Sequence, residues 1–156
     1  MEQLNALSPG RKLILGAGVL LLIDSFFHWQ AYGPYGLNAW HGFWGVLLGL
    51  MTLALLAWVG ARAFGVALPA NVPDGLFTLG LGALMTLFAL IKALSDSYTA
   101  WPAYVGIVLA AVAAYGGWLN FQDSGEELPK LATTAAAPPA PAAPASEEPP
   151  AAGTDG

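Results

Sequence analysis

WHGFWGVLLGLMTLALLAWVGARAF, the stretch at residues 40–64, decides the fold, because Arg62 is the only Lys, Arg, Asp or Glu in it. About 20 apolar residues, rising 1.5 Å each in a helix, cross a hydrocarbon core roughly 30 Å thick. Little polar striping interrupts the run, as expected where lipid rather than water covers the outer face of a helix. The stretch therefore predicts a membrane-spanning helix.

Three more runs of the same kind lie at residues 13–29, 76–94 and 101–121. Ser8 and Pro9 before the first run suit an N-cap and a first-turn proline, and Pro102 suits the first turn of the last helix. Arg11 and Lys12 precede the first run as in a signal peptide, but the residues after it lack a small-residue cleavage pattern. We therefore expect an all-α integral membrane four-helix bundle in a domain of residues 1–122, with helices at 9–29, 39–64, 74–95 and 101–121.

The composition supports this class and excludes others. Hydrophobic residues make up 56% of the chain and charged residues 10%, against roughly 25% charged in an average soluble domain. No basic face supports nucleic-acid binding. The chain has no cysteine, which excludes disulfides, thiolate metal sites and cysteine redox chemistry.

The charges divide the chain into two parts. Residues 1–122 hold four acids and four bases, whereas residues 123–156 hold six acids and one base, so the formal net charge of -5 lies entirely in the second part. From Thr133 onward the chain is almost entirely Ala, Pro, Thr, Ser, Glu and Gly, without a large apolar residue that could offset the entropy of ordering. We expect a disordered acidic tail at 123–156, which either is simply solvated or docks a partner.

The basic residues also predict an orientation. Arg11, Lys12, Arg62 and Lys130 lie on one side of the predicted membrane, and Lys92 lies on the other. The positive-inside rule then places both termini in the cytoplasm and the protein in the cell membrane as a multi-pass protein. Aromatic residues that prefer the membrane interface gather at the predicted outer boundary: Trp29, Tyr32, Tyr35, Trp40, Tyr98, Trp101 and Tyr104.

Five polar residues fall near that outer boundary, and they form the candidate site: Asp24, His28, His41, Lys92 and Asp96. Asp24 is the one acid inside an apolar run, and an ionisable residue at that depth is costly. Asp24 and His28 share a helix face if the first helix continues that far, and Lys92 and Asp96 are also four residues apart. The sequence therefore predicts a polar outer rim.

Four roles for this rim stay open. His28 and His41 with a carboxylate could bind zinc or copper, or the two histidines could hold a haem. Asp24 could relay protons or ions in a small transporter. The fourth role, which we favour, is structural: Asp24 bonds a helix end or pairs with Lys92 or His28. Because no catalytic motif is present, we expect no enzyme activity, no catalytic residue, no metal and no cofactor.

Glycines in the second predicted helix indicate close helix packing. Gly45 and Gly49 form a G-x-x-x-G pattern, and Gly42 lies one turn earlier. Small residues let helix backbones approach closely in a membrane. We expect Gly42, Gly45 and Gly49 to serve packing within the bundle, with dimerisation as the alternative.

Two stretches of the sequence, 24–32 and 96–104, resemble each other at an offset of 72 and are identical at five of nine positions. Such an echo fits a duplicated helical hairpin. It also fits the simpler explanation, which we favour, that aromatic belts recruit the same residue types at each outer boundary.

The stretch LSPGRKLILGAG at residues 7–18, with Asp24, the aromatic run FFHW at 26–29 and the YGG at 115–117, resembles a group of small four-helix membrane proteins of high-GC Gram-positive, actinobacterial type. The resemblance covers roughly residues 7–127. It implies the four-helix topology and a plasma-membrane location, but no activity and no functional residues.

We therefore expect a structural, accessory or partner-recruiting membrane protein. Its partners would be the lipid bilayer and either another membrane protein or a cytoplasmic protein bound through the tail. The alternatives are a small ion- or proton-coupled transporter or channel subunit that uses Asp24, and third a haem or metal protein that uses His28 and His41.

Overall fold

A computed structural model of the chain describes residues 7–69 and 72–127. The expected tail therefore lies outside the described residues from position 128 onward. In chain order the elements are α2 (Pro9–Asp24), β1 (His28–Tyr32), β2 (Tyr35–Asn38), α3 (Phe43–Ala63), α4 (Asp74–Ser95) and α5 (Trp101–Ser124). The described chain is thus mostly helical, with four helices and one small β-hairpin.

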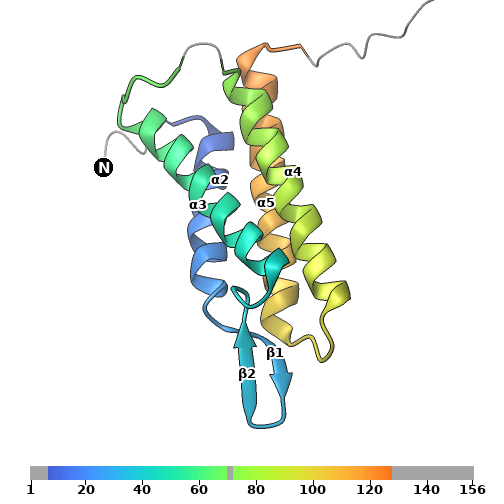
Figure 1. The fold of residues 1–156 in the computed structure, drawn as a ribbon. Coiled ribbons are helices and arrows are strands. Elements are labelled where there is room, and N and C mark those ends of the chain that lie inside the picture. Colours follow the sequence, from blue (N-terminus) through green and yellow to red (C-terminus); the bar gives the residue numbers. More distant parts are fainter. Residues whose placement is uncertain (1–6, 70–71, 128–156) are drawn as a thin grey trace, which may run out of the picture.

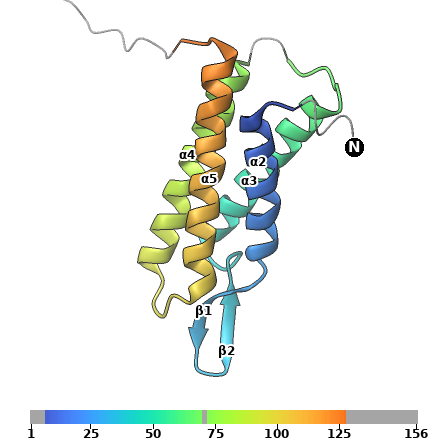
Figure 2. The same cartoon turned by 180° about the vertical axis from the view of Figure 1, so that it is seen from behind.

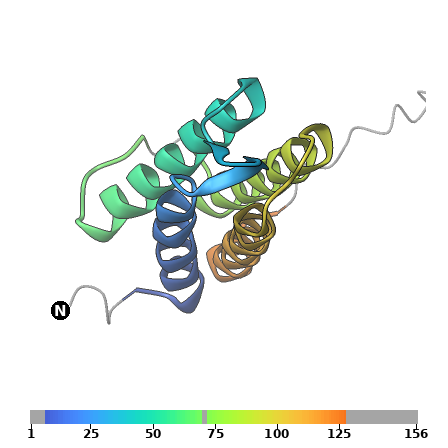
Figure 3. The ribbon, with the colours of Figure 1, turned by 90° about the horizontal axis from the view of Figure 1, so that it is seen from below.

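The four helices run alternately up and down, and the β-hairpin extends from one end of the bundle (Figure 1). We call the end where α3 and α5 begin the hairpin end, and the opposite end, where α2 and α4 begin, the Asp74 end. Seen from behind, α2 and α4 lie on either side of α5 (Figure 2). In the view along the bundle, α3 crosses on the side opposite α5 (Figure 3). The helix α5 makes the most extensive contacts with both α4 and α2.

Small residues on α5 permit these close contacts. A Cβ at Gly116 would lie 2.8 Å from the carbonyl oxygen of Gly10 in α2, and a Cβ at Gly117 would lie 2.8 Å from the carbonyl oxygen of Thr78 in α4. The backbones meet so closely because neither position carries a side chain. These glycine contacts join α5 to α2 and to α4.

Three helices, α3, α4 and α5, are long and apolar enough to cross a membrane. Large apolar side chains such as Leu50, Leu87 and Val108 are exposed on their outer faces, where lipid rather than water would cover them. The helix α2 has 16 residues and is shorter than these three. Length and composition thus indicate a multi-pass membrane protein in contact with a lipid bilayer.

The first helix ends earlier than the sequence predicted. We expected it to reach residue 29, but α2 ends at Asp24, and Ser25 caps it by donating its hydroxyl to the carbonyl of Leu22 at 2.6 Å. His28 begins β1 instead, and β1 pairs with β2 in an antiparallel hairpin. The prediction was wrong because Trp29 is apolar for a reason other than helical spanning: it folds back into the bundle and is buried, with 1% of its surface exposed. Phe26 and Phe27 of the same run are exposed.

The second helix also begins later than predicted, at Phe43 rather than 39. Gly42 has a φ of 80°, a left-handed conformation that a helix cannot contain and that glycine adopts without strain. The last helix continues three residues beyond the predicted end, to Ser124, and Gly125 caps it in the left-handed conformation.

Candidate functional site

Asp24 lies at the end of α2, buried against α5. The indole nitrogen of Trp29 donates to the Asp24 carboxylate at 3.1 Å and to its backbone carbonyl at 3.2 Å. A Cβ at Gly106 of α5 would lie 3.0 Å from the Asp24 carboxylate, so only glycine leaves room there. Asp24 therefore anchors the chain that folds back over the end of α2.

Both edges of β1 are bonded, and one of them joins the hairpin to the bundle. One edge pairs with β2, and the other forms a bridge between Gln30 and Thr99 in the loop between α4 and α5. The amide of Ala31 donates to the carbonyl of Tyr98 at 3.0 Å, and the amide of Ala100 donates to the carbonyl of Trp29 at 2.7 Å. The loop thus acts as a third, very short strand.

These bonds bring together the two stretches that echo each other in the sequence. The first stretch forms a helix end and β1, while the second forms a loop and then the start of α5 at Trp101. Trp29 is buried, whereas Trp101 is 70% exposed. Positions equivalent in the echo thus take different structures, which favours the explanation by boundary composition over duplication.

Lys92 of α4 is buried, with 2% of its side chain exposed, and it pairs with Asp96 at 2.7 Å. Its ammonium group also donates to the backbone carbonyl of His41 at 2.9 Å. Because a buried cation needs such partners, the lysine ties the chain entering α3 to α4. His41 takes part in this contact through its backbone carbonyl and not through its imidazole.

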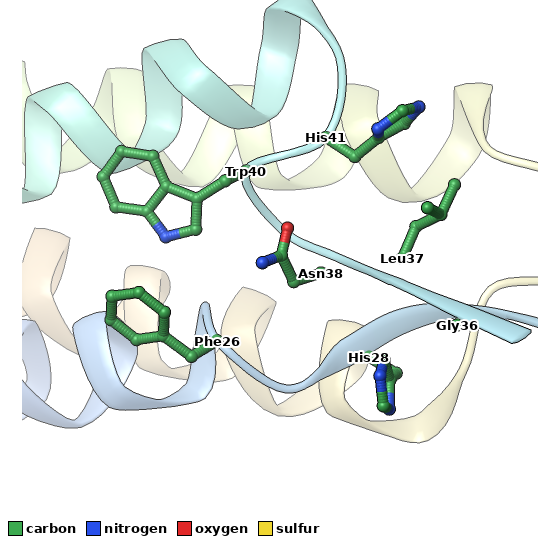
Figure 4. Close-up of a pocket in the computed structure, with 7 residues that line it drawn as sticks. All are labelled: Phe26, His28, Gly36, Leu37, Asn38, Trp40 and His41. Carbon is green, nitrogen blue, oxygen red and sulfur yellow. The ribbon is translucent and has the colours of Figure 1, made fainter.

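The two imidazoles are exposed and line a shallow pocket of about 320 Å³ beside the hairpin. They lie on opposite sides of the hairpin and point away from each other (Figure 4). Within the described chain no three His, Cys, Asp or Glu side chains gather in a way that could hold a metal ion. The full lining comprises Phe26, His28, Gly36, Leu37, Asn38, Trp40 and His41.

The predicted rim is therefore not one cluster. Asp24 bonds Trp29, Lys92 bonds Asp96 and the His41 carbonyl, and His28 lies on a strand rather than on the Asp24 face of a helix. The separation follows from the early end of α2, since the i, i+4 relation of Asp24 and His28 exists only within a helix.

Two of the three glycines pack within the described bundle, as we expected, and a Cβ at Gly45 would lie 3.0 Å from Cε of Lys92 in α4. Gly42 precedes the helix, and a Cβ there would meet nothing within 4 Å. Gly45 faces the backbone carbonyl of Ala39, and a Cβ at Gly49 would lie 2.5 Å from the Trp40 ring. Gly45 and Gly49 thus make room for the chain that leads from the hairpin into α3.

A second polar centre, at the Asp74 end, was not predicted from the sequence. The Asp74 carboxylate accepts hydrogen bonds from Trp58 at 2.7 Å, from Arg11 at 2.8 Å and from Asn120 at 3.2 Å. The Nε of Arg62 lies 3.5 Å away from it. Asp74 of α4 therefore contacts side chains of all three other helices.

Glu126 adds a further connection at this end. Its carboxylate accepts from the backbone amides of Gly75 at 3.1 Å and Leu76 at 2.8 Å, the free donors in the first turn of α4. A carboxylate at this position both satisfies the amides and interacts favourably with the helix dipole. The residues that follow α5 are thereby fixed to the start of α4.

The sequence did hold signals for this centre. Trp58 and Arg62 are four residues apart near the end of one helix, and Asn120 is an amide in an otherwise apolar stretch of another. Asp74, which directly follows Pro73, stands at the start of the predicted helix 74–95. An acid in the first turn of a helix is commonly solvated, so its contacts with the other helices were not predicted.

Between the two polar centres the described core is apolar. The fully buried large side chains there include Leu21, Leu48, Leu55 and Met85. Thr52, the polar residue among them, donates its hydroxyl to the carbonyl of Leu48 in its own helix at 2.8 Å. The described residues therefore form no continuous polar route from one end of the bundle to the other.

Comparisons with protein families, with curated proteins and with solved structures found no match to this chain.

Proposed function

We propose that this is a structural or accessory protein of the cell membrane, which acts by packing beside or recruiting another protein. The observation that carries the proposal is the bonding of the buried and half-buried charges: Asp24, Asp74 and Lys92 each tie together different parts of the bundle. A group that binds or moves a substrate needs free bonding capacity, whereas these groups stabilise one arrangement of helices.

The proposed orientation has both termini in the cytoplasm, which requires four crossings. The alternating directions of the four helices are compatible with it, and Arg11 and Arg62 both lie at the Asp74 end, as the positive-inside rule expects of a cytoplasmic end. The acidic residues after α5 would then face the cytoplasm. The resemblance to actinobacterial four-helix proteins stays a prediction consistent with this orientation.

The alternatives have less support. A transporter that uses Asp24 would need further polar groups along a path, and between Asp24 and the Asp74 end the described core is apolar except for Thr52, which is bonded within its own helix. A haem or metal held by His28 and His41 would need converging imidazoles, and these two diverge (Figure 4). Neither alternative gains a specific observation.

Cross-linking in intact membranes, followed by mass spectrometry, tests the proposal. We expect a membrane or cytoplasmic protein to cross-link at fixed stoichiometry to the full chain and to be lost when the chain is truncated after Lys130. The Asp24→Asn variant serves as the matched control and should keep the partner. Ion-dependent uptake into proteoliposomes that is abolished in Asp24→Asn, without a stoichiometric partner, would refute the proposal in favour of a transporter.

A further inference from the structure

Arg62, near the end of α3, has bonding capacity that the fold does not use. Among residues 7–69 and 72–127 its guanidinium group makes no hydrogen bond, and the Nε atom is buried 3.5 Å from an Asp74 oxygen. The side chain is 31% exposed, and of its nitrogens only Nε is both buried and without a hydrogen bond. Part of the guanidinium group therefore reaches the surface with N–H donors to spare.

Aromatic rings fix the direction of that side chain. The guanidinium carbon lies 5.7 Å from the centroid of the Trp58 ring, and the Trp58 ring packs on Phe77 of α4 at 4.4 Å. Trp58 is itself held by its bond to Asp74. Arg62 thus lies over the Trp58 ring, which packs at a tilt against Phe77, and beside the Asp74 carboxylate. Less side-chain entropy is therefore lost when the guanidinium group binds a ligand.

The charges at this end are unevenly distributed. The Asp74 carboxylate contacts two guanidinium groups, Arg11 and Arg62, whereas the Glu126 carboxylate is bonded to the backbone amides of Gly75 and Leu76. On the Arg11 side a pocket of about 220 Å³ is lined by Asp123 as well as Asp74, so an anion there would meet a second acid. The Arg62 side lies on α3, whose only charged residue is Arg62.

The neighbouring surface is apolar in the way a lipid-facing surface would be. Phe64 and Val66, which follow Arg62 at the end of α3, are 77% and 54% exposed. Aromatic and basic side chains together at a helix end are typical of the region where lipid headgroups meet the hydrocarbon. A water-soluble anion would have no use for these exposed apolar side chains.

We propose that Arg62 binds the phosphodiester of an anionic membrane lipid, with Trp58 as the platform of the site and Phe64 and Val66 against the acyl chains. Arg recognises phosphate through paired N–H donors, and basic sites at the membrane surface of transmembrane helices bind anionic headgroups. The site does not depend on the proposed accessory function. It suits the anionic cytoplasmic leaflet if the proposed orientation holds.

Native mass spectrometry of the full chain in detergent tests the site by titration with phosphatidylglycerol and, separately, with zwitterionic phosphatidylcholine. We expect tighter binding of phosphatidylglycerol and a loss of about tenfold in Arg62→Gln, which corresponds to about 1.4 kcal/mol. Lys12→Gln, which removes a base from α2 at the same end, should change the affinity less than about twofold, as expected for a single surface charge.

Arg62→Lys keeps the charge but removes the paired donors, and we expect a loss of about threefold, between the other two variants. This variant also decides the matter if Arg62→Gln does not fold. Equal affinity for both lipids, equal losses in Arg62→Gln and Lys12→Gln, or an Arg62→Lys variant that binds like the unaltered protein would overturn the proposal. Displacement of the lipid by inorganic phosphate would overturn it too, because the site would then bind a free anion.

Discussion

Asp74→Asn tests most directly how the bundle is held together, because the carboxylate of Asp74 joins α4 to each of the other helices. The two oxygens accept from Trp58 at 2.7 Å, Arg11 at 2.8 Å and Asn120 at 3.2 Å, and Arg62 lies 3.5 Å away. An asparagine has the same shape but keeps one acceptor oxygen and turns the other position into a donor. Donors of the surrounding helices would then face an N–H group.

The size of the effect follows from the bonds that are lost. About two interhelical interactions lose their acceptor, and each contributes about 0.6 kcal/mol on average and up to about 1.7 kcal/mol within a membrane. The Asp74 side chain is 14% exposed, so solvent screens the interaction only in part. We expect Asp74→Asn to lower the free energy of unfolding by about 1–3 kcal/mol.

Equilibrium unfolding in mixed micelles at increasing dodecyl sulfate measures this change. Asp123→Asn is the matched control, since it makes the same chemical change on the same end of the bundle, where Asp123 is exposed; it should stay within about 0.5 kcal/mol of the unaltered chain. Combining Asp74→Asn with Trp58→Phe should cost less than the sum of the two single changes by about 0.5–1.5 kcal/mol. Equal effects of Asp74→Asn and Asp123→Asn, or strict additivity with Trp58→Phe, would refute the role of Asp74.

Two further predictions concern the fit of glycine and the cap of α4. Gly106→Ala should lower the free energy of unfolding by about 1–3 kcal/mol because a Cβ there would overlap the Trp29 ring. Gly16→Ala, where a Cβ would meet nothing within 4 Å, should raise it by about 0.5–1 kcal/mol. Thermal unfolding measures both changes, and the same sign for both would contradict the packing. Glu126→Gln should weaken the cap by about 0.5–1 kcal/mol and speed hydrogen exchange at Gly75 about two- to fivefold, and unchanged exchange would speak against the cap.

The helices could be predicted because their signals are local. The predicted range 74–95 coincides with α4, and the predicted start at 101 coincides with that of α5. Asp74 after Pro73 and Pro102 in the first turn mark these starts within a few residues of sequence. Run length and helix-start chemistry carry enough information for elements of this kind.

The hairpin could not be predicted from the same signals, because the residues that decide it are apolar for long-range reasons. Trp29 is buried by contact with Gly106, and Ala39 donates to the carbonyl of Ser25 at 3.0 Å. A local signal was present in Gly33, which has a φ of 58° in the turn between the strands. The continuous apolar run at 13–29 nevertheless favoured a helix up to residue 29 in the prediction.

The candidate site shows the same division. Asp24 and Lys92 stood out as ionisable residues near apolar runs, and both are indeed buried. Their partners are the Trp29 indole and the His41 carbonyl. These contacts depend on how the chain folds back, which cannot be predicted from residue spacing. Asp74 was overlooked because its partners come from three separate helices.

The first helix is too short to reach the level at which α4 ends. Arg11 and Asp74, each in the first turn of its helix, are bonded to each other, so α2 and α4 begin at the same level. At 1.5 Å per residue, the 16 residues of α2 reach about 24 Å and the 22 residues of α4 about 33 Å. The difference of about 9 Å falls at the hairpin end of the bundle.

Irregular chain cannot face lipid in that space, because each unbonded backbone group there costs several kcal/mol. The chain after Asp24 meets this requirement by another route: β1 is bonded to β2 on one edge and to the chain at Thr99 on the other, and Trp29 fills the space against α5. On both of its edges β1 therefore has the bonded backbone that a membrane-spanning segment needs, whereas β2 forms the edge of the two-stranded sheet. This is the physical reason to propose four crossings although three helices alone are long enough.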